Sequence, residues 1–280
     1  MKKIIFNSSM PRSGSELLQV ILHQNPSIYG SPTSPLCDYI GSIRNCQLNP
    51  EVQSQPAEIM KQALFSTCKH AIHGYYEPIT NRPVVCDKSR TWLWHYDLLK
   101  NSLGETPKMI CIIRDLRDIF ASMENNWRKN RHLPIGPDNA IEAKQMMLED
   151  RIGYWSHNHP IGFSIKRLYD AGDQGYLKNV FILRYEDVTT FPDECMEKLY
   201  NYLELPYFQH DWKNIVKEVK EDHKWHGPYG NHDVKKELNP FLQPHKKILT
   251  NDICNRIIDG HRWYLVRIIL KYWNRVSLKI

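Results

Sequence analysis

Apolar and polar residues alternate along this chain with two different periods. Five short apolar runs, each followed by polar or Gly/Pro-containing sequence, have the length of buried strands. They predict strands at 3–8, 27–35 (which ends in a Pro-rich loop), 82–90, 108–115 and 179–187. Longer segments with apolar residues three or four positions apart predict helices at 15–24, 51–71, 91–102, 116–131, 140–157, 161–171 and 192–203. Beyond residue 211 the pattern predicts helices and long loops.

This order of elements predicts the fold class. Short apolar strands that alternate with long helices are typical of an α/β protein, with a parallel sheet covered by helices on both faces. No internal repeat, low-complexity run or change of composition divides the chain. We therefore expect a single domain over residues 1–280.

Composition and charge narrow the function classes. The net charge is +6 and the pI about 8.8, which favours anionic ligands but is too mild to indicate nucleic acid. The seven cysteines are odd in number and show no CxxC spacing, so we expect reduced thiols and no zinc site. The N-terminal apolar run is too short for a signal peptide, and no stretch reaches the ~18 apolar residues of a membrane span. These features predict a cytoplasmic enzyme.

Three polar loops follow predicted strands: "PRSGS", "DKSR" and "RDLRD". In parallel sheets, ligands bind beyond the carboxyl ends of the strands, where such loops meet. The first loop joins a strand to a helix, a geometry that holds a phosphate-like anion on free N–H groups. Gly14 permits a close backbone approach, Ser13 and Ser15 offer hydroxyls, and Arg12 adds a fixed charge. The alternative is a plain capping box, with Ser13 as N-cap and Glu16 at N3.

A second basic motif, "IIRDLRDIFASM", follows the most apolar strand. Arg114 ends that strand, and Ser122 lies eight residues later, about two helical turns away. Both could grip one phosphate above the strand end. Arg117 and Asp118 are interpreted instead as part of a solvated ion-pair cluster at the helix start.

"PRSGS" after the first strand, together with "RDLRDIFAS" after a later one, resembles the sulfotransferase family, whose donor is 3′-phosphoadenosine-5′-phosphosulfate (PAPS). "LRYEDVTTFPDECMEKLYNYLELP" resembles a later strand–helix segment of that family. Other segments look most like bacterial sulfotransferases that are distantly similar to the tyrosylprotein enzymes. The resemblance covers roughly 3–205 and implies a P-loop-like fold, with a helical and lid segment over about 206–280.

The resemblance also implies which residues bind the donor. The first loop would hold the 5′-phosphosulfate, Arg114 and Ser122 the 3′-phosphate, and Tyr185 would reach the adenine. Trp127 and Arg128 would line the same pocket, and Lys235 would come from a basic lid. The full set of expected nucleotide-binding residues is Arg12, Ser13, Gly14, Ser15, Glu16, Leu17, Arg114, Ser122, Arg128, Tyr185 and Lys235.

For the chemistry, the resemblance implies two cations near the sulfuryl group, Arg12 and Lys88, and no metal. The general base is where the sequence departs from the family. The tyrosylprotein enzymes carry a glutamate in the loop after the second strand, and the cytosolic small-molecule enzymes carry a histidine after the strand that here ends in "CDKSR". Both are missing here. Asp38 and Asp87 are the nearest substitutes, each with an alternative role as a cap or salt-bridge partner.

Histidines are weaker candidates for the base. His73 and His226 come next after the two aspartates, whereas His157 and His159 are interpreted as a helix-end cluster.

Two other functions remain as alternatives. A P-loop-like kinase is disfavoured because the loop lacks Gly-Lys-Ser/Thr and no acidic strand end suits Mg²⁺. A non-catalytic nucleotide- or anion-binding protein is the other. The expected acceptor is a hydroxyl on a carbohydrate, lipid, small metabolite or peptide tyrosine. The basic, aromatic stretch at 261–273 is compatible with a membrane surface, although we favour a helix packed on the domain.

Overall fold

The strands of the sequence pattern form one five-stranded sheet in the computed structural model, which describes residues 1–131, 145–219, 234–239 and 243–271. All neighbouring strands are parallel, in the order β2-β3-β1-β4-β5. The strands are β1 (Lys3–Asn7), β2 (Ile28–Thr33), β3 (Val84–Lys88), β4 (Met109–Ile113) and β5 (Val180–Arg184). Because they are parallel, their carboxyl ends lie at the same edge of the sheet.

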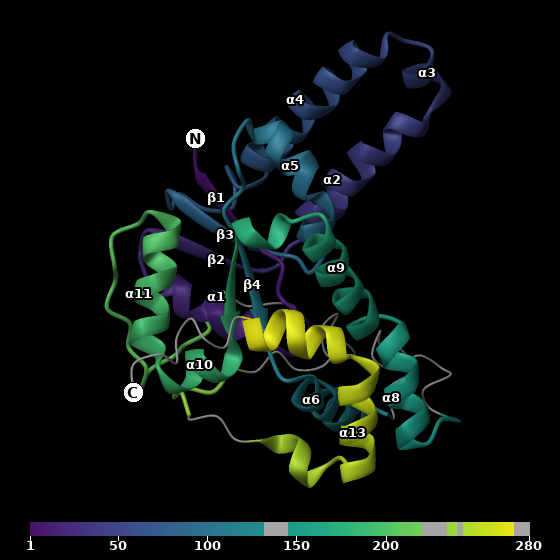
Figure 1. The fold of residues 1–280 in the computed structure, drawn as a ribbon. Helices are drawn as coiled ribbons and strands as arrows, with labels where there is room; N and C mark the ends of the chain where they lie inside the picture. Colours follow the sequence, from purple (N-terminus) through teal and green to yellow (C-terminus); the bar gives the residue numbers. More distant parts are fainter. Residues whose placement is uncertain (132–144, 220–233, 240–242, 272–280) are drawn as a thin grey trace.

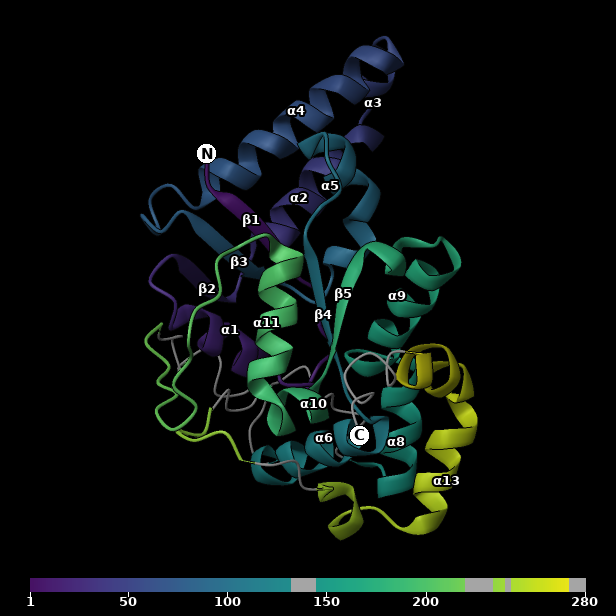
Figure 2. The same ribbon diagram turned by 60° about the vertical axis from the view of Figure 1, so that its left-hand side comes forward.

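Helices cover both faces of this sheet (Figures 1 and 2). On one face lie α1 (Ser15–His23), α10 (Tyr185–Thr190) and α11 (Pro192–Leu203). The other face is covered by α2 (Leu36–Asn45), α4 (Ala57–Tyr75), α5 (Tyr96–Leu103), α6 (Leu116–Asn130), α8 (Leu148–His157), α9 (Ile161–Asp173), α13 (Asn251–Gly260) and the π-helical η6 (Tyr264–Leu270). Short elements join them: η1 (Cys46–Leu48), α3 (Pro50–Gln53), η2 (Trp92–His95), η3 (Tyr176–Asn179) and η5 (Pro244–Lys247).

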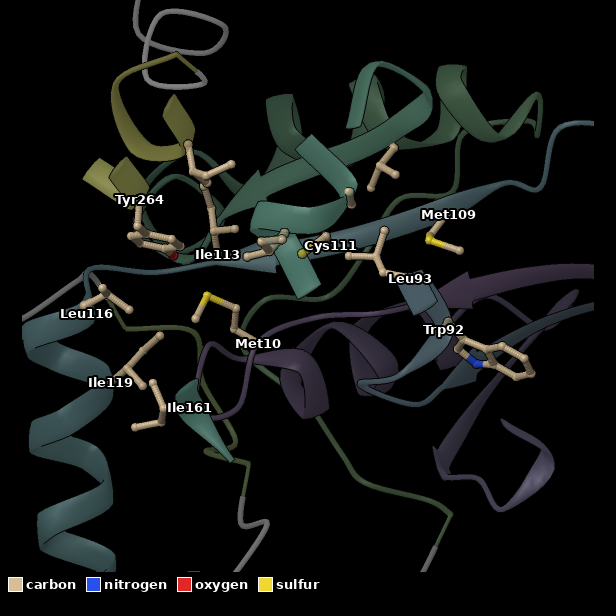
Figure 3. Packing of buried hydrophobic residues seen from close by; sticks show 14 of the residues in the cluster. Met10, Trp92, Leu93, Met109, Cys111, Ile113, Leu116, Ile119, Ile161 and Tyr264 are labelled. Atoms are coloured by element: carbon tan, nitrogen blue, oxygen red, sulfur yellow. The ribbon is translucent and has the colours of Figure 1, made fainter. Parts of the chain in front are cut away.

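Two apolar cores result from the alternation of side chains along each strand. In β1, Ile4 and Phe6 belong to the core under α2–α9, while Ile5 belongs to the core under α1 and α11. Met10, from the loop after β1, packs into the first core near Ile113 and Tyr264 (Figure 3). The buried methionine anchors a loop that otherwise consists of small and polar residues.

The predicted elements are largely present, and the fold class is confirmed. Three differences have local causes. Helix α2 was not predicted; it starts after Pro35, where the hydroxyl of Ser34 accepts the N–H of Leu36. The helix predicted over 51–71 is broken near Pro56, which cannot donate to a preceding turn. The predicted start of the 140–157 helix lies outside the described residues.

The segment α2–α3–α4 forms an arm that projects beyond the sheet in both views (Figures 1 and 2). The arm carries exposed apolar side chains, among them Tyr39, Leu48 and Ile59. Within the described part of the chain, no helix has both the length and the apolar character needed to span a bilayer.

Candidate active site

The polar loops that the sequence singled out meet at the carboxyl edge of the sheet. In the parallel register, Asn7 at the end of β1 pairs with Lys88 at the end of β3, and Ile113 of β4 pairs with Arg184 of β5. Arg114 and Tyr185, which directly follow β4 and β5, therefore approach the loop at 8–14 from one side, and the residues that follow β3 approach it from the other.

The loop after β1 ends in an α1 N-terminus that no side chain caps. Gly14 is the N-cap residue, with a left-handed φ of 93° and no side-chain acceptor at the helix start. The alternative of a capping box with Ser13 and Glu16 is wrong: Ser13 is buried and its Oγ donates to the carbonyl of Met10 at 2.7 Å. The first-turn N–H groups of α1 are thus oriented toward the loop without a side-chain carboxylate or hydroxyl cap, which suits an anion.

Arg12 links the first loop to the second motif. Its φ of 57° lies in the left-handed region, which costs a non-glycine residue roughly 1–3 kcal/mol. In this conformation Arg12 Nε donates to Ser122 Oγ at 3.0 Å, and Arg114 Nη1 donates to the Arg12 carbonyl at 3.0 Å. Residues that are about 100 positions apart in the sequence are therefore in direct contact.

Tyr185, the residue directly after β5, belongs to the same cluster. Its ring lies under the guanidinium of Arg114, 4.3 Å from the ring centre, and against Gly14. A Cβ on Gly14 would lie 2.5 Å from Tyr185 Cδ2, so only glycine fits. The predicted strand ran through residue 187, but β5 ends at Arg184 and Tyr185 opens α10.

Arg114 is held in place through its backbone as well as its side chain. The hydroxyl of Tyr264 accepts the Arg114 N–H at 3.3 Å and donates to the Arg114 carbonyl at 2.9 Å. The Nε of Arg114 is buried without a hydrogen-bond partner. A buried guanidinium N–H that lacks an acceptor indicates a place for an anionic oxygen. Sequence reasoning missed Tyr264, since a buried tyrosine on a late helix gives no local signal.

Lys88 lies at the end of β3 and faces α1. Its Nζ is bonded to Glu16 Oε2, and the other oxygen of Glu16 contacts Lys217 Nζ at 2.7 Å. Burial alone would raise the pKa of Glu16, but the two lysines outweigh it and lower that pKa below its usual value. Glu16 therefore stays ionised and fixes the Lys88 side chain. Lys217, from a polar loop after α11, was missed because nothing in its local sequence marks it.

The two aspartates proposed as bases lie in different places. Asp87 precedes Lys88 and so points to the opposite face of the sheet. There it is fully buried and accepts from Tyr76 Oη and Trp92 Nε1, both at 2.6 Å. Asp38 is exposed in the first turn of α2, directly after the end of β2. Of the two, only Asp38 lies exposed next to the carboxyl edge of the sheet.

The histidine candidates are scattered. His73, near the end of α4, lies close enough to the N-terminal amino group to be affected by its charge, and that group precedes β1 at the opposite edge of the sheet. His226 falls outside the described residues. His157 bonds the carbonyl of Gly153 at 3.0 Å within its own helix, and His159 stacks on Phe163.

Other predicted ligands have partners of their own. Arg128 pairs with the buried Glu124, which also takes a two-point contact from Arg151. Trp127 packs under that second arginine, 3.6 Å from its guanidinium carbon to the ring centre. Lys235 is exposed in a segment that hydrogen bonds to residues 212–215.

The ion-pair cluster predicted at the start of α6 is only partly correct. Arg117 does pair with Asp115, which also caps the helix. Asp118, however, is fully buried and bonds His245 Nδ1 at 2.7 Å, because η5 packs onto α6 at this point.

Comparisons with known proteins show the family of the chain. A family model described as "Sulfotransferase family" matches residues 5–209. A protein-tyrosine sulfotransferase from Drosophila melanogaster is 24% identical over 215 residues, which are 73% of this chain but only 38% of the fly protein. The chain thus spans well under two thirds of that relative's length.

Solved structures show the same fold at low identity. The sulfotransferase domain from the curacin biosynthetic pathway superposes with a TM-score of 0.56 at 19% identity, covering 93% of this chain and 97% of that one. Retinol dehydratase in a complex with retinol and PAP gives a TM-score of 0.50 at 14% identity, covering 100% and 84%. The match of the family model over most of the chain, together with this fold, shows that the chain belongs to the sulfotransferase family.

Proposed function

We propose that this protein transfers the sulfuryl group of PAPS to an acceptor hydroxyl by an in-line reaction. The observation that carries the proposal is the contact between the two motifs: Arg12 donates to Ser122, and Arg114 donates to the Arg12 carbonyl. One loop and one strand end thereby form a single basic site next to an uncapped helix start. The retinol dehydratase structure, which holds PAP, has the same fold and supports a nucleotide of this type.

The chain's own residues fit the two ends of such a donor. The helix start at Gly14, with the hydroxyl of Ser15, would bind the 5′-phosphosulfate. The buried Nε of Arg114 and the hydroxyl of Ser122 would take the 3′-phosphate. Tyr185, which stacks on Arg114, would contact the adenine. PAPS supplies an activated sulfuryl group, and the protein supplies position and charge.

In the reaction, a bond forms between the acceptor oxygen and sulfur while the bond from sulfur to the 5′-phosphate oxygen breaks. The electron pair of that broken bond stays on the phosphate, so negative charge increases there. Lys88 and Arg12 would stabilise this charge, which is the larger part of catalysis when charge moves between oxygens. Glu16 keeps the Lys88 side chain in one orientation. The acceptor proton would pass to a base, for which Asp38 is the better placed of the two aspartates.

Binding and transfer can be tested separately. Calorimetry with adenosine 3′,5′-bisphosphate should show tight binding, and ATP should bind more weakly because it carries no 3′-phosphate for Arg114 to contact. Transfer of ³⁵S from labelled PAPS to a panel of hydroxyl compounds then tests the reaction. Equal affinity for ATP and the bisphosphate would contradict the assignment of Arg114 and Ser122.

A further inference from the structure

Arg167, on α9, is a buried arginine that has no anionic partner among the described residues. Only 2% of its surface is exposed, and its Nη1 is buried with no hydrogen-bond partner. Its Nη2 donates to Ser164 Oγ at 2.6 Å, and its guanidinium carbon lies 5.3 Å from the ring centre of Trp94. A guanidinium taken out of water needs acceptors for its five donors, so this arrangement is costly unless something else supplies them.

Further positive charge lies beside it. Burial, together with the nearby charge of Arg90, lowers the pKa of Arg167 to about 10. Burial also lowers the pKa of His159, and the charges of Arg167 and Arg90 add to that effect. Three groups that repel one another when charged are thus gathered from the loop after β3, the turn before α9 and α9 itself.

Nearby carboxylates do not neutralise Arg167. In the described part of the chain, no aspartate or glutamate forms an ion pair with Arg167. Asp170 on the same helix pairs with Lys166 at 3.5 Å, and Asp97 accepts from Tyr176. Arg167 is therefore a cation in the protein interior, and the acidic side chains near it are paired with other donors.

A cavity adjoins Arg167, and hydrogen bonds tie the neighbouring segment to the first loop of the candidate active site. Arg167 and Trp94 line a cavity of about 380 Å³, whose other walls include Leu93, Leu98 and Arg44 together with the already paired Asp97 and Asp170. Arg90 comes two residues after Lys88, and its carbonyl accepts from Ser8 Oγ of the first loop at 2.9 Å. The same Oγ accepts the N–H of Leu93, so the pocket wall is tied to that loop.

We infer that Arg167 and Arg90 bind an anionic group of the acceptor, so that the natural acceptor is a hydroxyl compound with an acidic group on an apolar body. The inference rests on the proposed function. It narrows the acceptor class, because the apolar part of the wall, with Leu93, Trp94 and Leu98, takes the body of the molecule while the guanidinium groups take its carboxylate or phosphate. Two-point contact between a guanidinium and such an anion gives both affinity and orientation, which would direct the hydroxyl toward the sulfuryl group.

The test compares acids with matched neutral compounds. Bisphosphate-loaded protein is titrated with 4-hydroxyphenylacetate and its methyl ester, 6-hydroxyhexanoate and its methyl ester, and hydroquinone monophosphate beside hydroquinone. We expect at least one anion to bind about 10- to 100-fold more tightly than its neutral match, as for a hydrogen-bonded charge. The phosphate pair distinguishes a phosphate site from a carboxylate site.

Variants then locate the effect. Arg167→Gln should remove the preference for the anion without changing the affinity for the neutral compound, and Arg90→Gln should reduce it. Arg256→Gln, at an exposed arginine paired with Asp252, should leave the preference intact. Because Arg90 is exposed, its variant decides the matter if Arg167→Gln does not fold.

Two results would overturn the inference. In the first, the wild type binds no anion more tightly than its neutral match. In the second, the preference for the anion is retained in Arg90→Gln and in every Arg167 variant that folds. A protein that does not bind the bisphosphate would instead contradict the proposed function. The acid and ester titrations are then carried out on the ligand-free protein, so the two failures are distinct.

Discussion

Replacement of Arg114 by alanine is the most direct test of the nucleotide site. In the structure the side chain already makes a charged hydrogen bond to the Arg12 carbonyl and stacks on Tyr185, so part of its effect exists before any ligand binds. A hydrogen bond from a charged donor is worth about 1.5–3 kcal/mol. We therefore expect the variant to lose some stability through a looser first loop.

The loss of binding should be larger than this structural effect alone. Truncation of a buried partner of an ionic group costs about 2–4 kcal/mol, so the affinity for adenosine 3′,5′-bisphosphate should fall roughly 30- to 1000-fold. Ser122→Ala removes a single neutral hydrogen bond and should cost about 1 kcal/mol, or roughly fivefold. The ratio between the two variants separates a charged from a neutral contact with the 3′-phosphate.

Calorimetry measures the affinity, and thermal unfolding without ligand measures the structural part. Arg117→Ala is a matched control, since that arginine lies three residues away and pairs with Asp115. It should bind the bisphosphate within about twofold of the wild type, since this partly exposed pair lies outside the proposed phosphate contacts. If Arg114→Ala also binds within twofold, the 3′-phosphate site must lie elsewhere and the reasoning from the buried Nε is refuted.

Four further changes test the rest of the site. Lys88→Ala should keep near-normal bisphosphate affinity in calorimetry but lose about 10²–10³ in ³⁵S transfer, and Lys88→Arg should not fully restore it; a wild-type rate would exclude Lys88 from catalysis. Gly14→Ala should lower the free energy of unfolding by more than Gly104→Ala in urea titrations. At both positions the positive φ costs an alanine about 1–2 kcal/mol, but only at Gly14 would the added Cβ also lie 2.5 Å from the Tyr185 ring. Equal losses of unfolding free energy in the two variants would contradict that contact. The lowered pKa of Glu16 predicts stability that is fully present above pH 4.5, the usual value, and lost as the pH falls through the lower folded value. Glu16→Gln should therefore flatten the acid side of the stability–pH curve, and an unchanged curve would contradict the ion pair with Lys88. Asp38→Asn should reduce transfer by about 10²–10⁴ without affecting bisphosphate binding if it is the base, whereas retained transfer would remove it from consideration.

The parts of the fold that could be predicted depend on local pattern. Buried strands such as β4 are continuous apolar runs, so their positions and the parallel sheet follow from the sequence. Helix α2 was missed because its sequence contains Gly41 and Ser42, which weaken the helical pattern. Its first turn is instead stabilised by the hydroxyl of Ser34.

The residues of the site that could be predicted also depend on local pattern. Arg12, Gly14 and Arg114 stand in short motifs at strand ends, so sequence reasoning could name them. Their mutual contacts depend on packing between elements that are far apart in the chain. The same is true of the roles of Tyr264 and Arg167. The orientation of Asp87 could have been predicted, because successive side chains of a strand point to opposite faces and Asp87 and Lys88 are neighbours in β3.

The central position of β1 has a consequence for how the chain is made. Its pairing partners are β3, about 80 residues later, and β4, more than 100 residues later. At a synthesis rate of about 5–20 residues per second, Ile4, Ile5 and Phe6 have no strand to pair with for roughly 4–16 seconds. During that time an apolar segment with free backbone groups is open to association with other chains. Translation speed and chaperone access while residues 1–110 are made should therefore affect the yield of folded protein more than any change near α13.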